Sequence, residues 1–387
     1  MHYYGAVYRP PSEAYSLIVQ CTLGCSHNKC AFCNMYKDKK FSIRPVEEVL
    51  RDLAEARSYE RRIERIFLAD GDALILPMDY LLQVLDFIRE YFPECTRVAA
   101  YATTKAIERK TDEELRKLRE HGLALVYIGL ESGNEELLLK FNKGVTAAET
   151  VKNALRCKAA GIAISVTAIN GMAGLNGDWQ AHAIDTAKAV SAMKPEFIAF
   201  LTLRVYSGTP LHDWIEAGEF QMMGPVDLMR ETRLFLEHID SEGSVFRSNH
   251  ASNYLPLGGT LNRDREALIQ TIDAALDGKV LFLPCGVRQR DSQLIETYIA
   301  RDVYIVEYET LLQSGALADG VLDLTAEAVG PEYPGRAYTD LDAADWVLAA
   351  EGVPLDTTTL EKADAVCPAG YVLYRNPDAQ RVRFVVS

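Results

Sequence analysis

The 387-residue sequence contains no apolar run of the roughly 18 to 20 residues that a helix needs to cross a bilayer. Its first five residues lack the basic-then-apolar pattern of a secretory signal. Nor is the composition that of a disordered chain, because 48% of the residues are hydrophobic and 25% are charged. At roughly 150 residues per average domain, the length predicts one large domain plus a smaller one. We therefore expect a cytoplasmic protein with a sizeable core.

Positive charge is in short supply. Lys and Arg number 41 against 55 Asp and Glu, a net charge of −14. Nucleic-acid binding depends on clustered cations, so this balance disfavours a nucleic-acid partner. Residues 281–387 carry −9 of the total and a single lysine, Lys362, whereas residues 1–280 carry −5. This difference predicts two domains, 1–280 and an acidic C-terminal domain at 281–387.

The cysteines are not spread as in a disulfide-rich scaffold. Four of the eight fall within thirteen residues and the other four are solitary. In a reducing compartment, clustered thiols indicate metal binding. The solitary thiols are expected to be small buried hydrophobic residues. They are Cys95, Cys157, Cys285 and Cys367.

Strand-like and helix-like segments alternate through the first 240 residues. Such alternation predicts βαβ units around a parallel sheet, with ligands at the loops that follow the strands. The strand-like runs lie at 15–20, 65–69, 97–102, 124–129, 162–169 and 197–203, and the helix-like ones at 45–58, 78–92, 111–121, 145–160, 178–193 and 225–239. Beyond them we expect a helix at 262–277, a strand at 279–284 and an edge strand at 381–386.

Three cysteines follow the first predicted strand with the spacing C-x4-C-x2-C: Cys25, Cys30 and Cys33. Three thiolates on one loop can hold three irons of a four-iron cluster and leave the fourth iron open. The alternative is a structural zinc site with Cys21 or His27 as the fourth ligand. Zinc sites prefer two ligand pairs on separate turns, and the sequence offers no second pair.

This loop resembles that of the radical S-adenosylmethionine (SAM) superfamily, and the segment 203–210 resembles one found in its porphyrinogen-oxidase-like members. The usual spacing there is C-x3-C-x2-C with an aromatic residue before the last cysteine, and Phe32 supplies that aromatic. The first gap is one residue longer here, a variant known in the superfamily. The common spacing cannot start at Cys21, because position 28 is Asn, so Cys21 is interpreted as a strand-end residue. The resemblance implies an α/β fold, a partial (β/α)6 barrel, followed here by a smaller α+β domain.

Other loops carry segments that resemble the SAM-binding motifs of that family. Gly71 and Asp72 stand where the family has Gly-Gly-Glu, whose backbone binds the SAM amino group. Glu131 and Ser132 match its Gly-x-Glu-Ser-Gly, which approaches the SAM ribose or carboxylate. The resemblance further places the backbone at Asn170 near the adenine and Arg204 near the SAM carboxylate.

Simpler interpretations stand beside these. Glu131 and Ser132 could only start a helix, and Asp72 could only be a turn residue. The basic run 37–40 with Arg44 fits a solvated face, or otherwise a surface that attracts an anionic substrate or a reductase. His250 and Tyr254 are candidate substrate contacts, with packing as the alternative.

The resemblance implies an enzyme whose cofactors are a [4Fe–4S] cluster and SAM. Reductive cleavage of SAM would give a 5′-deoxyadenosyl radical that acts on a substrate, which we expect to be a small molecule. An electron donor such as flavodoxin or ferredoxin would be its partner. The alternative is an iron–sulfur or zinc module for electron transfer or sensing, which would not need the Gly-x-Glu-Ser-Gly segment.

Overall fold

The computed structural model describes residues 2–59, 62–250 and 252–277, together with the backbone of six short strands between 317 and 386. The predicted strand at 279–284 and two of the solitary cysteines, Cys285 and Cys367, lie outside the described residues.

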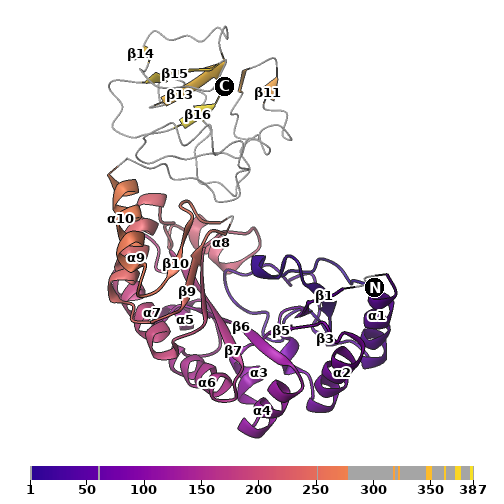
Figure 1. The fold of residues 1–387 in the computed structure, drawn as a ribbon. Helices are drawn as coiled ribbons and strands as arrows, with labels where there is room; N and C mark the ends of the chain where they lie inside the picture. The colour runs from indigo at the N-terminus through magenta and orange to yellow at the C-terminus, as the bar shows by residue number, and fades with distance from the viewer. Residues whose placement is uncertain are drawn as a thin grey trace.

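One sheet of eight strands organises the described part of the chain, in the order β1-β4-β5-β6-β7-β8-β9-β10. Its first six strands are parallel and confirm the six predicted ones: β1 (Leu17–Gln20), β4 (Arg65–Ala69), β5 (Arg97–Tyr101), β6 (Leu123–Glu131), β7 (Ala163–Asn170) and β8 (Phe197–Thr202). Two strands that the sequence did not predict extend the sheet, β9 (Val245–Ser248), parallel to β8, and β10 (Leu257–Thr260), antiparallel to β9. Since β1 and β10 stand at opposite ends of the strand order, the sheet is an open, partial barrel (Figure 1).

The helices lie along the outer side of the curved sheet (Figure 1). Those predicted from the sequence are present as α1 (Val46–Tyr59), α2 (Met78–Tyr91), α4 (Asp112–Glu120), α6 (Ala147–Ala159), α7 (Trp179–Met193), α9 (Pro225–His238) and α10 (Arg265–Leu276). Three short helices were not predicted: α3 (Thr104–Glu108), α5 (Glu135–Lys140) and α8 (Pro210–Glu216). Two 3-10 turns, Pro11–Glu13 and Ala73–Ile75, complete this part of the chain.

The strands are buried on both faces, which explains their nearly continuous apolar sequence. Along β4, Ile66 and Leu68 pack into the larger core cluster, whereas Phe67 and Ala69 belong to a second cluster with Leu125. The N-terminal segment adds polar contacts beside this second cluster. Ser12 bonds the Tyr127 hydroxyl (2.8 Å) and the Glu13 carboxylate pairs with Arg97 (2.6 Å).

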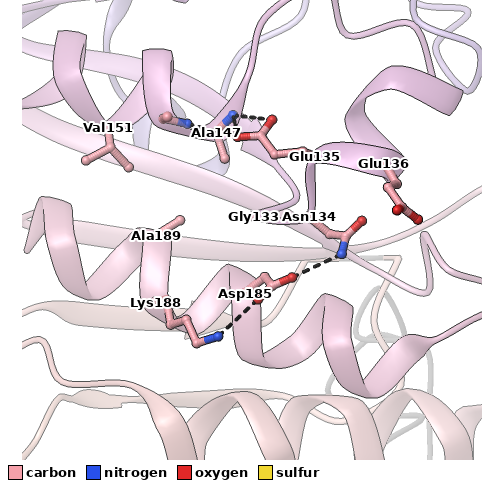
Figure 2. A pocket seen from close by; sticks show the side chains of 10 residues that line it. Gly133, Asn134, Glu135, Glu136, Ala147, Val151, Asp185, Lys188 and Ala189 are labelled. Atoms are coloured by element: carbon pink, nitrogen blue, oxygen red, sulfur yellow. Dashed lines mark hydrogen bonds and ion pairs between the residues drawn. The ribbon is translucent and has the colours of Figure 1, made fainter.

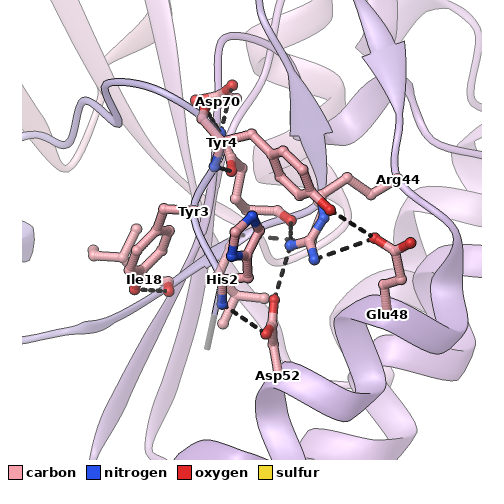
Figure 3. Close-up of polar contacts among 11 residues, drawn as sticks. His2, Tyr3, Tyr4, Ile18, Arg44, Glu48, Asp52 and Asp70 are labelled. Carbon is pink, nitrogen blue, oxygen red and sulfur yellow. Dashed lines mark hydrogen bonds and ion pairs between the residues drawn. The ribbon is translucent and has the colours of Figure 1, made fainter.

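The structure corrects the interpretation of the basic run 37–40 with Arg44 as a solvated face. Arg44 is only 4% exposed, and its guanidinium bonds the Asp52 carboxylate (2.9 Å) and the Gln20 carbonyl (2.7 Å), as Figure 3 shows. Lys39 is likewise almost buried and pairs with Asp70 (3.3 Å). The expectation of a solvated basic face is therefore wrong for Arg44 and Lys39. It fits the exposed Lys37 and Lys40.

After residue 280, all described residues lie in strands. Four of these strands form a sheet in the order β14-β15-β13-β16: β14 (Glu361–Lys362), β15 (Tyr371–Arg375), β13 (Trp346–Ala350) and β16 (Phe384–Val386). The last of them, β16, stands at an edge of this sheet, as the sequence predicted. The other two, β11 (Leu317–Ala318) and β12 (Val321–Leu322), pair with each other. The domain boundary at 280 stays a prediction. Within the described residues, no helix combines the length and apolar character needed to span a membrane.

Candidate functional site

The three clustered cysteines lie on the loop between β2 (Thr22–Leu23) and β3 (Ser42–Ile43), two short strands that pair antiparallel just beyond the end of β1. Each of the three thiols is half-buried. The middle of the loop is fixed by backbone bonds to two helix ends, since Ala31 N–H donates to the Phe141 carbonyl (2.9 Å) and the Ala31 carbonyl accepts from Leu211 N–H (3.1 Å). The loop thus sits against α5 and α8, far from it in sequence.

Two buried aspartates after β4 brace this loop from the other side. The Asp70 carboxylate accepts a hydrogen bond from the backbone N–H of Gly24 (2.8 Å). The Asp72 carboxylate accepts from the Ser26 hydroxyl (2.5 Å) and from both the backbone N–H and the hydroxyl of Thr103 (3.0 and 2.9 Å). The side chain of Asp72, predicted only as a backbone element, therefore ties the cysteine loop to the loop after β5.

Between these aspartates, only glycine fits. A Cβ on Gly71 would lie 2.7 Å from the Cβ of Cys25 and 2.9 Å from its Cα. Gly71 N–H also donates to the Gly24 carbonyl (3.0 Å). The predicted pair Gly71–Asp72 is thus packed directly against the first cysteine of the motif.

A buried ion pair stands beside the thiols. The Lys143 ammonium lies 2.7 Å from a carboxylate oxygen of Glu131, and the two side chains are 17% and 13% exposed. Glu131 has a left-handed backbone (φ 63°) at the end of β6, which aims its side chain away from the regular strand direction. Burial lowers the pKa of Lys143, but Glu131, Cys30 and Cys25 together raise it above its usual value. The ammonium therefore lies within electrostatic reach of both thiols.

Burial opposes ionisation of the thiols themselves. It raises the pKa of Cys30 to about 11 and also raises that of Cys33, and the nearby Glu131 charge adds to both shifts. Lys143 acts in the opposite direction. Without a metal the thiols of Cys30 and Cys33 would stay protonated at neutral pH, so binding iron must displace their protons.

The sequence interpretation missed Lys143. No local pattern singles it out, since it lies ten residues beyond the Gly129–Gly133 segment with Lys140 as a second cation in between. It stands at a turn whose neighbour Gly144 has a left-handed φ of 76°. A Cβ on Gly144 would lie 2.6 Å from the ring of His27, so this turn packs on the cysteine loop. The His27 ring also bonds the Asn142 carbonyl (2.6 Å).

The donor set fits an iron–sulfur cluster. Thiolate sulfur is the usual protein ligand of such clusters, with each cysteine on its own iron. Among the described residues, no three His, Cys, Asp or Glu side chains are grouped so as to hold one metal ion. A cluster does not require the sulfurs to converge on a single ion.

A buried hydroxyl without a partner points the same way. Tyr36 is 4% exposed, and its hydroxyl has no hydrogen-bond partner in the part of the chain that the structure describes. Burial raises its pKa, and the nearby Tyr101, Asp70, Cys25 and Cys33 add to that rise. Buried unpaired donors are rare in folded proteins and call for a missing acceptor. Cluster sulfur is such an acceptor.

Two of the other predicted residues are buried in polar contacts behind these loops. The Ser132 hydroxyl bonds His182 Nδ1 (2.9 Å) and accepts from Asn134 N–H (2.9 Å). Asn134, not Ser132, caps α5, so the helix-start interpretation of Ser132 is wrong. The Asn170 side-chain amide donates to the Thr232 hydroxyl (2.7 Å).

The remaining two predicted residues are Phe32 and Arg204. Phe32 packs on Phe141, with ring centroids 6.0 Å apart, in a cluster that includes Leu203. Arg204 lies near His250 and, with burial, lowers the pKa of that imidazole. The structure therefore places Gly71, Asp72 and Glu131 near the cysteine loop, which itself contains Phe32. It places Arg204 near His250, a candidate substrate contact.

A separate open cleft of about 510 Å³ lies on the helical side of the β6 loop. Figure 2 shows it between α5, α6 and α7. Glu135 there accepts from the backbone N–H of Ala147 (3.1 Å), and Asp185 pairs with Lys188 (3.2 Å) and accepts from Asn134 (3.0 Å). The carboxylates of Glu135 and Asp185 are thus already engaged within the protein, and none of the clustered cysteines lines the cleft.

With this geometry in place, the family model of the radical SAM superfamily matches residues 19–187, a span that starts within β1 and ends within α7. It contains the cysteine loop, both aspartates and the Glu131–Lys143 pair. Residues 19–187 are thus similar to the domain shared by the radical SAM superfamily. Members of this family are enzymes that use a [4Fe–4S] cluster and SAM. The fold is the α/β partial barrel expected of such a protein.

One curated relative is an uncharacterized protein of Methanocaldococcus jannaschii, 22% identical over 239 residues, which are 59% of this chain and 72% of that protein. Similar solved structures include the radical SAM methyltransferase TsrM of Kitasatospora setae, with 19% identity, a TM-score of 0.43 and coverage of 51% of this chain and 38% of that one. The coproporphyrinogen III oxidase HemN of Escherichia coli shows 16% identity, a TM-score of 0.43 and coverage of 57% and 52%. The chain thus spans about two fifths of TsrM and half of HemN. Since both scores lie below 0.5, the family assignment comes from the family model.

Proposed function

We propose that this radical SAM protein reductively cleaves SAM at a cluster held by Cys25, Cys30 and Cys33, and uses the product on a small molecule. The observation that carries the proposal is the set of three half-buried thiols beside the buried Glu131–Lys143 pair, at the carboxyl ends of parallel strands. Ligands of such sheets bind at this edge.

When bound, the cluster and SAM together supply a 5′-deoxyadenosyl radical, the hydrogen-abstracting species of the family. The protein's own task is to hold and shield them. Asp70 and Asp72 fix the cysteine loop, Gly71 allows its close approach, and Phe32 covers one side with an aromatic ring. Each of these contacts preorganises the thiols before any cofactor binds.

Two cations are candidates for the SAM carboxylate. Arg204 was the one predicted from the sequence, and Lys143 is the one that the structure places beside Cys30 and Cys25. The amino and carboxylate groups of SAM must reach the open iron, so the cation that acts on the thiols is the better placed. We therefore assign the carboxylate to Lys143 and direct Arg204, with His250, toward the substrate.

Exposed cations near the cysteine loop support an acidic electron carrier, of the flavodoxin or ferredoxin kind, as the redox partner in the cytoplasm. Lys29 and Lys105 both act on His27 at the edge of the loop, and Lys37 bonds the Asn28 carbonyl (2.9 Å). All three lysines are exposed, in a chain whose net charge is −14. Complementary charge of this kind speeds encounter with an acidic partner.

The test uses protein reconstituted with iron and sulfide without oxygen, reduced with dithionite and mixed with SAM. We expect 5′-deoxyadenosine to form and the EPR signal of the reduced cluster to change on adding SAM. Cys30→Ala should abolish both, whereas Cys157→Ala, which removes a buried thiol on α6, should leave both intact. Iron incorporation without any response to SAM would instead support an electron-transfer or sensing module. Zinc in place of iron would overturn the proposal.

A further inference from the structure

A buried histidine links the two loops that follow β6 and β7. His182, on α7, is 2% exposed. Its Nδ1 lies 2.9 Å from the Ser132 hydroxyl, and its Nε2 lies 3.1 Å from the Ile169 carbonyl at the end of β7. With Nε2 protonated, the ring donates to Ile169 and accepts from Ser132, so a single tautomer satisfies both contacts.

A buried glutamate continues this connection. Glu231, on α9, is 1% exposed, and its carboxyl group accepts from the backbone N–H of Gly171 (3.0 and 3.2 Å). The same carboxyl lies 3.4 Å from His182 Nε2. Its chain neighbour Thr232 accepts from the Asn170 amide (2.7 Å). Two successive residues of α9 therefore hold the last residue of β7 and the first residue of the loop that follows it.

The surroundings of this pair are apolar and closed. The space around it has no room for a water molecule, and its walls include Ala168, Phe200 and Phe235. Burial lowers the pKa of His182 to about 4 and raises that of Glu231 to about 8, so both groups are neutral at pH 7. Two buried polar side chains cost stability compared with apolar ones of similar volume. Their contacts lead to the two loops: besides Thr186 of its own helix, His182 contacts Ser132 and Ile169, and Glu231 contacts Gly171.

Those contacts fix the loops that are assigned to SAM. Gly171 has a left-handed φ of 85°, a conformation that the Glu231 contact holds in one state. Ser132 immediately follows Glu131 of the ion pair described above. Neither His182 nor Glu231 contacts the cysteine loop, so they would act on the far, nucleoside end of SAM and leave the cluster unaffected.

We propose that His182 and Glu231 are positioning residues that set the loops after β6 and β7 relative to each other and so determine the affinity for the nucleoside half of SAM. This inference rests on the proposed function. It predicts that replacing either residue weakens nucleoside binding and leaves cluster assembly unchanged.

The experiment compares wild type, His182→Leu, Glu231→Leu and Glu231→Gln as reconstituted proteins. We expect the Kd for SAM and for 5′-deoxyadenosine to rise at least about tenfold in both leucine variants, with iron content and the SAM-free EPR signal unchanged. Glu231→Gln keeps a neutral acceptor for Gly171 and should restore affinity to within about threefold of wild type. His121→Leu, which removes a histidine paired with Asp86 between α2 and α4, is the matched control and should bind as wild type.

A leucine variant that fails to fold does not end the test. Ser132→Ala and His182→Gln, singly and together, measure the coupling between the loop hydroxyl and the imidazole. Non-additive losses of 5′-deoxyadenosine affinity support the inference, and additive losses overturn it. If wild type binds SAM and all variants bind equally well, the inference alone fails. If reconstituted wild type binds no SAM, the proposed function fails and takes the inference with it.

Discussion

The Lys143 ammonium lies 2.7 Å from the Glu131 carboxylate, and the same ammonium acts on the thiols of Cys30 and Cys25. One lysine therefore connects the loop after β6 to the cysteine loop, a link that no local sequence pattern reveals. The pair leaves a cation at the edge of the proposed cluster, where a carboxylate ligand would bind.

Replacing this cation should weaken SAM binding. Lys143→Met keeps much of the side-chain volume but removes the charge, so Glu131 is left unpaired. We expect a loss in SAM affinity of about tenfold or more, since charge-assisted contacts contribute about 1.5 to 3 kcal/mol. SAM titration followed by EPR measures it. Lys117→Met, an exposed change on α4, is the control. An unchanged Kd for SAM in Lys143→Met would favour Arg204 as the partner of the SAM carboxylate.

Removing the Asp70 carboxylate should weaken the attachment of the cysteine loop to the loop after β4. Asp70→Ala leaves the Gly24 N–H, the Gln20 amide and the Lys39 ammonium without their shared acceptor. Because buried unpaired donors are costly, we expect a loss of about 3 kcal/mol in the free energy of unfolding and reduced iron incorporation. Urea denaturation and iron analysis measure the two. Asp86→Ala, a half-exposed site on α2, should change neither; equal losses in both variants would contradict a specific role for Asp70.

The unpartnered hydroxyl near the cysteines gives a redox prediction. Tyr36→Phe removes a buried donor that has no acceptor among the described residues, so the iron-free protein should change in stability by less than about 1 kcal/mol. If cluster sulfur accepts this hydrogen bond, its loss makes the midpoint potential of the reconstituted protein more negative. The control is Tyr80→Phe, whose buried hydroxyl also lacks a partner but lies on α2 beside Cys21. Identical midpoint potentials in wild type and both variants would show that the Tyr36 hydroxyl does not donate a hydrogen bond to the cluster.

The buried Glu231 predicts how stability depends on pH. Its pKa rises from 4.5 to about 8 on folding because burial favours the neutral acid. The unfolded state thus loses its proton first, and the contribution of Glu231 to stability is complete below pH 4.5 and is lost as pH rises toward 8. Among the described residues, His182 and the more distant Asp185 are the titratable groups near Glu231, and His182, with a pKa of about 4, stays largely neutral over that range.

Between pH 5 and 8, this one group should lower the free energy of unfolding by roughly 1.4 kcal/mol per pH unit. Glu231→Gln cannot titrate and should remove that part of the slope, which denaturation at several pH values detects. Equal slopes in wild type and Glu231→Gln would show that Glu231 is ionised in the folded protein.

The sequence alone determined the strands of the barrel and most of its helices. Strands buried on both faces need continuous apolar runs, so β4 to β8 could be read directly from composition. The short helices escaped because α3, α5 and α8 have five to seven residues, too few for a recognisable helical period. The cysteine loop was also evident, since three thiols within nine residues stay in one region of the molecule whatever the fold.

Only the tertiary structure decided which polar residues face those thiols. Lys39 and Arg44 looked like surface charges, yet both are buried on carboxylates. Lys143 and His182 carry no local signal, because their partners lie 12 and 50 residues away and meet only when the parallel strands align their ends. Local sequence fixes periodicity and the spacing of neighbours, whereas the choice of partner for a buried charge depends on which strand ends the sheet brings together.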